Sequence, residues 1–295
     1  MTQASESALT LDPASDQTGK PDTGEQAPKK PSEQILRHEL KEARDAFQRS
    51  NSHLLFSSVA AGLELGFSVL LMGRIQTLVA GQVPLAVEEI LVANMYAFGF
   101  ILVVIGRSEL FTEQTSLAVL PVLNRQASIG QLARLWSVVY IGNMLGAACM
   151  AGIIAFIGPA MGIIAPRELG AIAKGIVNHP PGVIICSGIM AGWLMGLLSW
   201  LVAAGRDTIS QIVIVWMITT AIGISHLHHV VAGTVEVLAG MFATGEISLA
   251  QLGIFLLCCT IGNATGGPFF VAVLKFAIAH NGNEPERRFY SRDYL

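Results

Sequence analysis

Six long apolar runs restrict what this chain can fold into. A helix that crosses a bilayer needs roughly 20 mostly apolar residues. Only 13% of the 295 residues are charged, whereas an average soluble domain carries about 25%. The sequence therefore predicts an all-α membrane protein. We expect six transmembrane helices, at 54–79, 87–106, 130–157, 182–204, 208–226 and 249–279.

The segments outside these runs are polar. Residues 1–31 have few large apolar side chains and cannot offset the entropy cost of folding, so we expect disorder there. Residues 32–53 show helical apolar spacing, with Ser32 as a candidate cap, and predict an amphipathic helix at the membrane surface or against the bundle. The six-span domain then covers 54–280 and a tail covers 281–295. The N-terminus shows no signal-peptide pattern, because no apolar core follows a basic start.

The basic residues indicate an orientation. With the N-terminus inside, the N-terminal segment, the loops after the second and fourth spans and the tail hold nearly all of them. Because cytoplasmic loops carry an excess of Lys and Arg, we expect both termini in the cytoplasm. Cytoplasmic examples are Lys29, Lys30, Arg37, Arg125, Arg206, Arg287 and Arg288, against Arg74, Arg167 and Lys174 outside.

The two halves of the chain repeat one another. "IGNMLG" at 141–146 recurs as "IGNATG" at 261–266, and "SVAAGLELG" at 58–66 is echoed by "SGIMAGWLMG" at 187–196. Glycines at this spacing favour close helix packing. Since each copy holds three spans, the second must be inverted. Inverted repeats of this kind are typical of transport proteins.

The second and fifth spans are interrupted. "GRSELFTEQTS" at 106–116 breaks the second, and "GISHLHHVVAGTVEV" at 223–237 breaks the fifth. Each continues as a shorter apolar piece, at 115–123 and 231–243. Non-helical backbone at membrane depth survives only where protein or a water-filled cavity satisfies it. We therefore expect the breaks to line a solute path.

These motifs resemble the formate/nitrite transporter family from about residue 50 to 280. The resemblance rests on "ELFT" in the second span, "GN" in the third and sixth, a histidine at the break of the fifth, and the stretch "SIGQLARLWSVVYIGNMLGA". It implies an aquaporin-like fold, a homopentamer with one pore per protomer, and passage of small monovalent anions or their acids. It also suggests a bacterial inner membrane.

The resemblance also assigns residues. Thr112 of "ELFT" corresponds to the pore threonine and His229 to the central histidine, which is able to pass a proton to an entering anion. Asn143 and Asn263 would brace the broken segments by hydrogen bonding. Apolar constrictions would flank the histidine, with Tyr96 and Phe100 on one side and Ile222 on the other.

The chain also departs from the family pattern. A glutamate that precedes the central histidine in relatives is His228 here, and we match an asparagine of the fourth span to Gly192. His228 and His226 are open to either a pore or a structural role. Because charges at membrane depth should face one another or water, we predict that at least two of the new glutamates approach the breaks and that Arg107 pairs with one. The new ionisable groups are Glu64, Arg107, Glu113 and Glu236.

Two transport functions remain open. One is a channel for a small weak-acid anion, coupled to protons through His229. The other is a channel of the same fold for a cation or neutral solute, which acidic pore residues would favour. A regulatory or scaffold membrane protein is a third possibility. No nucleophile–base pair or cofactor motif indicates an enzyme, no matching ligand cluster indicates a metal, and a net charge of -3 gives no sign of nucleic-acid binding.

Overall fold

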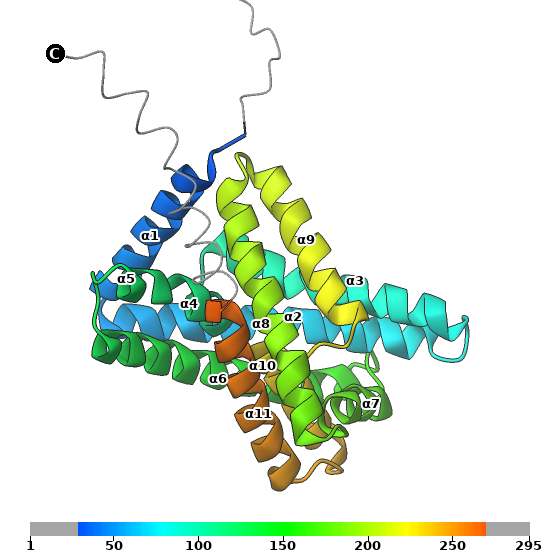
Figure 1. Ribbon diagram of the computed structural model, residues 1–295. Helices are drawn as coiled ribbons and strands as arrows, with labels where there is room; N and C mark the ends of the chain where they lie inside the picture. Colours follow the sequence, from blue (N-terminus) through cyan, green and yellow to red (C-terminus); the bar gives the residue numbers. More distant parts are fainter. Residues whose placement is uncertain (1–28, 270–295) are drawn as a thin grey trace, which may run out of the picture.

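The computed structural model describes residues 29–269, and every regular element in that part of the chain is helical (Figure 1). Five of its helices, α2, α3, α6, α8 and α11, are long and apolar enough to cross a membrane. In chain order the helices are α1 (Ser32–Gln48), α2 (Asn51–Val79), α3 (Leu85–Gly106), α4 (Phe111–Leu117), α5 (Val119–Leu123), α6 (Ile129–Ala160), α7 (Pro166–Val177), α8 (Pro181–Ala204), α9 (Thr208–Ile224), α10 (Val230–Thr244) and α11 (Leu249–Gly267).

Polar side chains fix where the apolar helices begin. Ser128 and Ser248 each accept a hydrogen bond from the backbone N–H three residues on, and Gln131 and Gln251 bond back to the serine N–H. These capping boxes satisfy N–H groups that a helix start leaves without partners. The same device thus opens α6 and α11, which carry the two matching "IGN" motifs.

Two segments differ from the sequence-based expectation. The amphipathic helix ends at Gln48 instead of residue 53, because Ser50 caps a new helix that starts at Asn51. Ser32 is the first helical residue and not the cap: Pro31 occupies the cap position, without a side-chain bond. The helix α7 was not expected, since its 12 residues fall below the length of a span.

Glycines let the long helices approach closely. A Cβ at Gly146 of α6 would lie 2.1 Å from the Val59 carbonyl oxygen of α2, and one at Gly266 of α11 would lie 2.0 Å from that of Ile189 in α8. Side chains at these positions would collide with the neighbouring backbone. The pairs α2–α6 and α8–α11 therefore pack through matching small-residue contacts.

Large apolar side chains cover much of the outside of the bundle. Phe56 on α2 and Phe156 on α6 are both 75% exposed, and Leu257 on α11 is 64% exposed. A surface this apolar is suited to lipid or to neighbouring protomers rather than to water. The amphipathic α1 lies across one end of the bundle, beside α5 (Figure 1). Of the expected domains, residues 1–28, the end of the sixth span and the 281–295 tail lie outside the described residues.

Candidate functional site

The first break separates α3 from α4. The helix α3 ends at Gly106, Arg107 takes a left-handed conformation (φ 59°), and α4 begins at Phe111. The second break has the same form: α9 ends at Ile224, His226 is left-handed (φ 49°), and α10 begins at Val230. Left-handed backbone is uncommon outside glycine, so each helix is interrupted at a defined residue.

Asn143 braces the first break. Its side-chain oxygen accepts from the Phe111 N–H (2.8 Å), and its amide nitrogen donates to the carbonyls of Glu109 (2.9 Å) and Ser58 (2.8 Å). One buried side chain on α6 thus satisfies backbone groups of the break and of α2. Such groups would otherwise be costly in an apolar interior.

Asn263 braces the second break with the corresponding three bonds. It accepts from the Val230 N–H (2.8 Å) and donates to the carbonyls of His228 (2.9 Å) and Gly188 (2.8 Å). Both asparagines are fully buried. The two breaks are therefore held by one arrangement used twice.

The breaks bring Thr112 and His229 together. Thr112 Oγ1 lies 2.8 Å from His229 Nε2, although the residues are 117 positions apart. Both side chains are buried, at 0% and 1% exposure. His229 is also the N-cap of α10, the end of the helix where partial positive charge gathers.

The surroundings of His229 define its tautomer. The Ala232 N–H donates to Nδ1 (3.3 Å), so a neutral ring carries its proton on Nε2. That N–H then donates to Thr112, which leaves the threonine hydroxyl hydrogen available to a further acceptor. The pair thus presents a hydrogen-bond donor at the junction of the two breaks.

Aromatic side chains of α3 cover this pair. The Phe100 ring meets the His229 imidazole edge-on, with 5.0 Å between ring centroids, and Tyr96 lies 5.1 Å from Phe100. Ile222 lines the same cavity as Tyr96. Our expectation that Ile222 faces the opposite side of His229 from Tyr96 is therefore wrong: the α3–α9 contact places both residues on one side.

Two cavities lie on different sets of helices. The α7 cavity, about 220 Å³, is walled by α2, α3, α7, α9 and α10, and its lining includes Tyr96, Ile222, His226 and Glu236. The α1 cavity, about 300 Å³, lies under α1 against α3, α4, α8 and α9, and its lining includes Glu39, Arg107, Glu109 and Glu113. Thr112, Phe100 and His229 line neither cavity.

The new glutamates are distributed over different environments. Glu113 is on the first turn of α4 and lines the α1 cavity, whereas Glu236 is 5% exposed and lines the α7 cavity. Glu64 lines neither. Its Oε1 lies 3.9 Å from where a Cβ at Gly106 would sit, and its buried Oε2 has no hydrogen-bond partner within residues 29–269.

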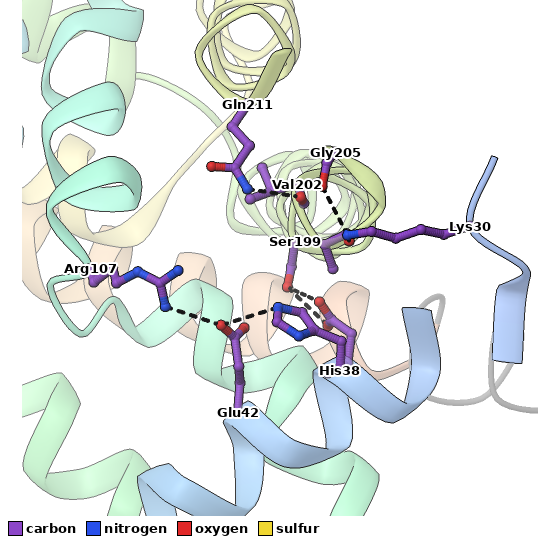
Figure 2. Close-up of polar contacts among 10 residues, drawn as sticks. Lys30, His38, Glu42, Arg107, Ser199, Val202, Gly205 and Gln211 are labelled. Atoms are coloured by element: carbon purple, nitrogen blue, oxygen red, sulfur yellow. Dashed lines mark hydrogen bonds and ion pairs between the residues drawn. The ribbon is translucent and has the colours of Figure 1, made fainter. Parts of the chain in front are cut away.

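Arg107 does not form its ion pair with any of those glutamates. It points to Glu42 of α1, with 3.4 Å between Nη1 and Oε1, and His38 approaches the same carboxylate at 3.5 Å (Figure 2). The Arg107 side chain is 79% exposed. The prediction that Arg107 pairs with a glutamate of the membrane spans was therefore wrong. It considered only those spans, whereas Glu42 lies on the surface helix α1, which has no transmembrane pattern.

Further polar contacts fasten α1 over its cavity, and the sequence analysis missed them. Ser199 of α8 donates to the buried Glu39 carboxylate at 3.1–3.3 Å, and Lys30 donates to the carbonyls of Ala203 and Gly205 (Figure 2). Arg49 pairs with Glu109. Burial raises the pKa of Glu39 to about 8, the Ser199 hydrogen bond opposes the rise, and the nearby Glu42 charge adds to it.

His228 is held by protein on both ring nitrogens. Nδ1 lies 2.8 Å from Ser187 Oγ, and Nε2 lies 2.9 Å from the Ile176 carbonyl of α7. Ser187 also accepts from the His228 N–H. Ser187 thus gives His228 a partner on the fourth span. At Gly192, which we match to the asparagine of relatives, a Cβ would lie 2.5 Å from the Asn263 carbonyl oxygen. Within residues 29–269, no three His, Cys, Asp or Glu side chains are grouped to hold a metal ion.

Comparisons with known proteins agree with this arrangement. The sequence profile described as "Formate/nitrite transporter" matches residues 33–277. The chain is 33% identical over 265 residues to "Inner membrane protein YfdC" of Escherichia coli (strain K12), covering 88% of this chain and 82% of that protein. It is 24% identical to "Nitrite transporter NirC" of the same organism, with 82% and 90% covered.

Two solved structures share the fold. An "FNT family ion channel" superposes with a TM-score of 0.73 at 22% identity, covering 82% of this chain and 98% of that one. A "Pentameric formate channel with formate bound" superposes with a TM-score of 0.65 at 23% identity, covering 81% and 98%. The profile match, the relatives and the apolar helices together lead to one conclusion: the chain is a transmembrane protein that belongs to the formate/nitrite transporter family.

Proposed function

We propose that this chain forms a homopentameric channel for a small monovalent weak acid of the formate or nitrite kind. One observation carries the proposal: the buried Thr112–His229 hydrogen bond, formed where two braced helix breaks meet. A relative is named a nitrite transporter and a structural neighbour a formate channel. The family consists of transporters and channels, which supports a transport role over an enzymatic one.

The architecture we propose is an inverted repeat of three plus three spans. The first copy comprises α2, α3–α4–α5 and α6, and the second comprises α8, α9–α10 and α11. The matching Asn143 and Asn263 networks and the matching capping boxes support this arrangement. In this proposal both termini lie in the cytoplasm of a bacterial inner membrane, so the α1 cavity is the inner mouth and the α7 cavity the outer one.

The path runs from one cavity to the other through the Thr112–His229 pair. Phe100, Tyr96 and Ile222 would close it against hydrated ions, since dewetted apolar rings exclude water. A solute that passes them meets the Thr112 hydroxyl, whose oxygen accepts from the His229 Nε2–H, and the positive end of α10. We assign His228 to bracing the second break, because both its ring nitrogens have protein partners.

His229 would also transfer a proton to the solute. A weak-acid anion that accepts a hydrogen bond from Thr112 can leave as the neutral acid if His229 has first taken up a second ring proton from a cavity. The imidazolium then passes one proton through the Thr112 hydroxyl to the anion and returns to the neutral ring. Neutral transfer would also let the acid leave past the carboxylates of the exit mouth, which repel an anion.

A second candidate is a channel for a cation or neutral solute. The carboxylates in both cavities favour it: Glu236 in one, and Glu113 and Glu39 in the other. In the weak-acid proposal, proteoliposomes take up labelled formate faster as the external pH falls. Formate-independent currents that reverse at the cation equilibrium potential would favour the second candidate. Absence of both would leave the regulatory or scaffold role.

A further inference from the structure

The α7 cavity holds a buried carboxylate that has no partner in the described part of the chain. Glu236 on α10 is 5% exposed and lines the cavity, yet it makes no hydrogen bond or ion pair with any residue between 29 and 269. An unpaired charge in an apolar interior costs several kcal/mol, so such groups usually have a partner. A ligand in the cavity would supply one.

The rest of the cavity lining favours a positively charged ligand. Glu88 and Glu89, at the start of α3, also line the cavity, and none of its lining residues is Lys or Arg. Of the basic residues adjacent in sequence to the lining, Lys174 of α7 pairs with Glu246 (2.6 Å) and Arg74 of α2 donates to the Ile163 carbonyl (3.1 Å), whereas His226 lines the cavity itself. The cavity therefore attracts cations and repels anions.

The side chains of the cavity walls determine which kind of cation fits. Apolar side chains such as Val92, Ile172 and Leu227 form most of the surface, and the Tyr96 ring adds an aromatic face. A small metal ion loses too much hydration energy here, because no three ligands among residues 29–269 are grouped to replace its water. An ammonium group with an apolar substituent suits both the carboxylate and the ring, through a charge-assisted hydrogen bond and a cation–π contact.

We propose that the α7 cavity binds a small organic monocation of the alkylammonium class, with Glu236 as its counter-ion. The ligand would donate N–H hydrogen bonds to the carboxylate and place its apolar part against the cavity wall. Because Tyr96 and Ile222 line the same cavity, an occupied site obstructs the entrance to the constriction. In this respect the inference rests on the proposed function, whereas binding itself does not.

Calorimetric titration of the purified full-length protein with methylammonium chloride tests this directly, with sodium chloride as the reference salt. We expect saturable binding of methylammonium at one site per protomer. Glu236→Gln should weaken it by about tenfold or more, the loss of one charge-assisted hydrogen bond. Asp207→Asn is the control, because that exposed residue caps the far end of α9, lies outside the cavity lining and should leave the affinity unchanged.

Wild-type protein that responds alike to both salts would overturn the proposal, and so would unchanged affinity in Glu236→Gln. If Glu236→Gln does not assemble, the double variant Glu88→Gln/Glu89→Gln takes its place, since Glu88 is half-buried and Glu89 exposed. We expect the loss of these two negative charges to weaken methylammonium binding about two- to fivefold. Unchanged affinity counts against the site. Formate uptake is measured separately: binding without uptake means that only the proposed function fails.

Discussion

The two breaks share a frame and differ in what surrounds it. Asn143 and Asn263 make the same three hydrogen bonds at corresponding places. Around the first break lie charged residues, including Arg107, Glu109 and Glu113, beneath the surface helix α1. The second is enclosed by α7 and α8, with His228 fastened to Ser187. The bracing sets the position of Thr112 and His229, and the surroundings set the charge at each mouth.

The largest effect should come from removing either brace. Asn143→Leu and Asn263→Leu each leave one N–H and two carbonyls without their partner, which we expect to cost about 3 kcal/mol or more. Unfolding in mixed detergent micelles measures both variants against wild type. Since the networks match, the two losses should be similar. A large loss in one variant and none in the other would show that the breaks are not held alike.

The glycine contacts should rank next. Gly146→Ala and Gly266→Ala each place a Cβ near 2 Å from a backbone oxygen, and forcing the helices apart should cost about 1–3 kcal/mol. The same unfolding assay compares them with Gly152→Ala on α6, whose Cβ would meet nothing within 4 Å. That control should be neutral or stabilising by about 0.5–1 kcal/mol. Equal behaviour of all three would contradict close packing at matching positions.

The α1 contact should make the first break sensitive to pH. Burial raises the pKa of Glu39 from 4.5 to about 8. The docked helix therefore holds a proton that the free carboxyl releases, and docking weakens as the pH rises from about 4.5 to about 8. Hydrogen exchange of α1 amides, corrected for intrinsic rates, should show more opening at pH 9 than at pH 6. Glu39→Gln should remove the difference; a difference of the same size in that variant rules out Glu39 as its source.

Arg107→Gln should have the smallest effect on stability. The pair with Glu42 is exposed on the arginine side, and exposed ion pairs contribute about 0–1 kcal/mol. From the sequence alone we would expect a large loss from a stranded buried carboxylate; the structure reverses that expectation. A loss of several kcal/mol in the unfolding assay would mean that Arg107 instead supports the half-buried Glu113.

The sequence predicted what depends on local pattern. Apolar length marks the long helices, and polar or glycine-rich stretches mark the places where α3 and α9 stop. The spacing within the "IGN" motifs also identified Asn143 and Asn263 as a related pair. None of these required knowledge of distant contacts.

Features that depend on tertiary contact were missed. Glu42 is 65 positions from Arg107. Ser187 meets His228 only because of how α8 packs on the second break. The helix α7 is too short to be recognised from the sequence as a membrane span. Ile222 was placed on the wrong side of His229 for the same reason: counting from motifs does not show how α9 packs on α3.

The central claim is that the solute path runs through the Thr112–His229 pair. Formate uptake into proteoliposomes across a range of external pH tests it most directly, with His229→Asn compared with wild type and with His226→Asn, an exposed histidine of the same break. We predict that acid-stimulated uptake is lost in His229→Asn, with the oligomer intact, and retained in His226→Asn. Unchanged acid-stimulated uptake in His229→Asn would contradict the account.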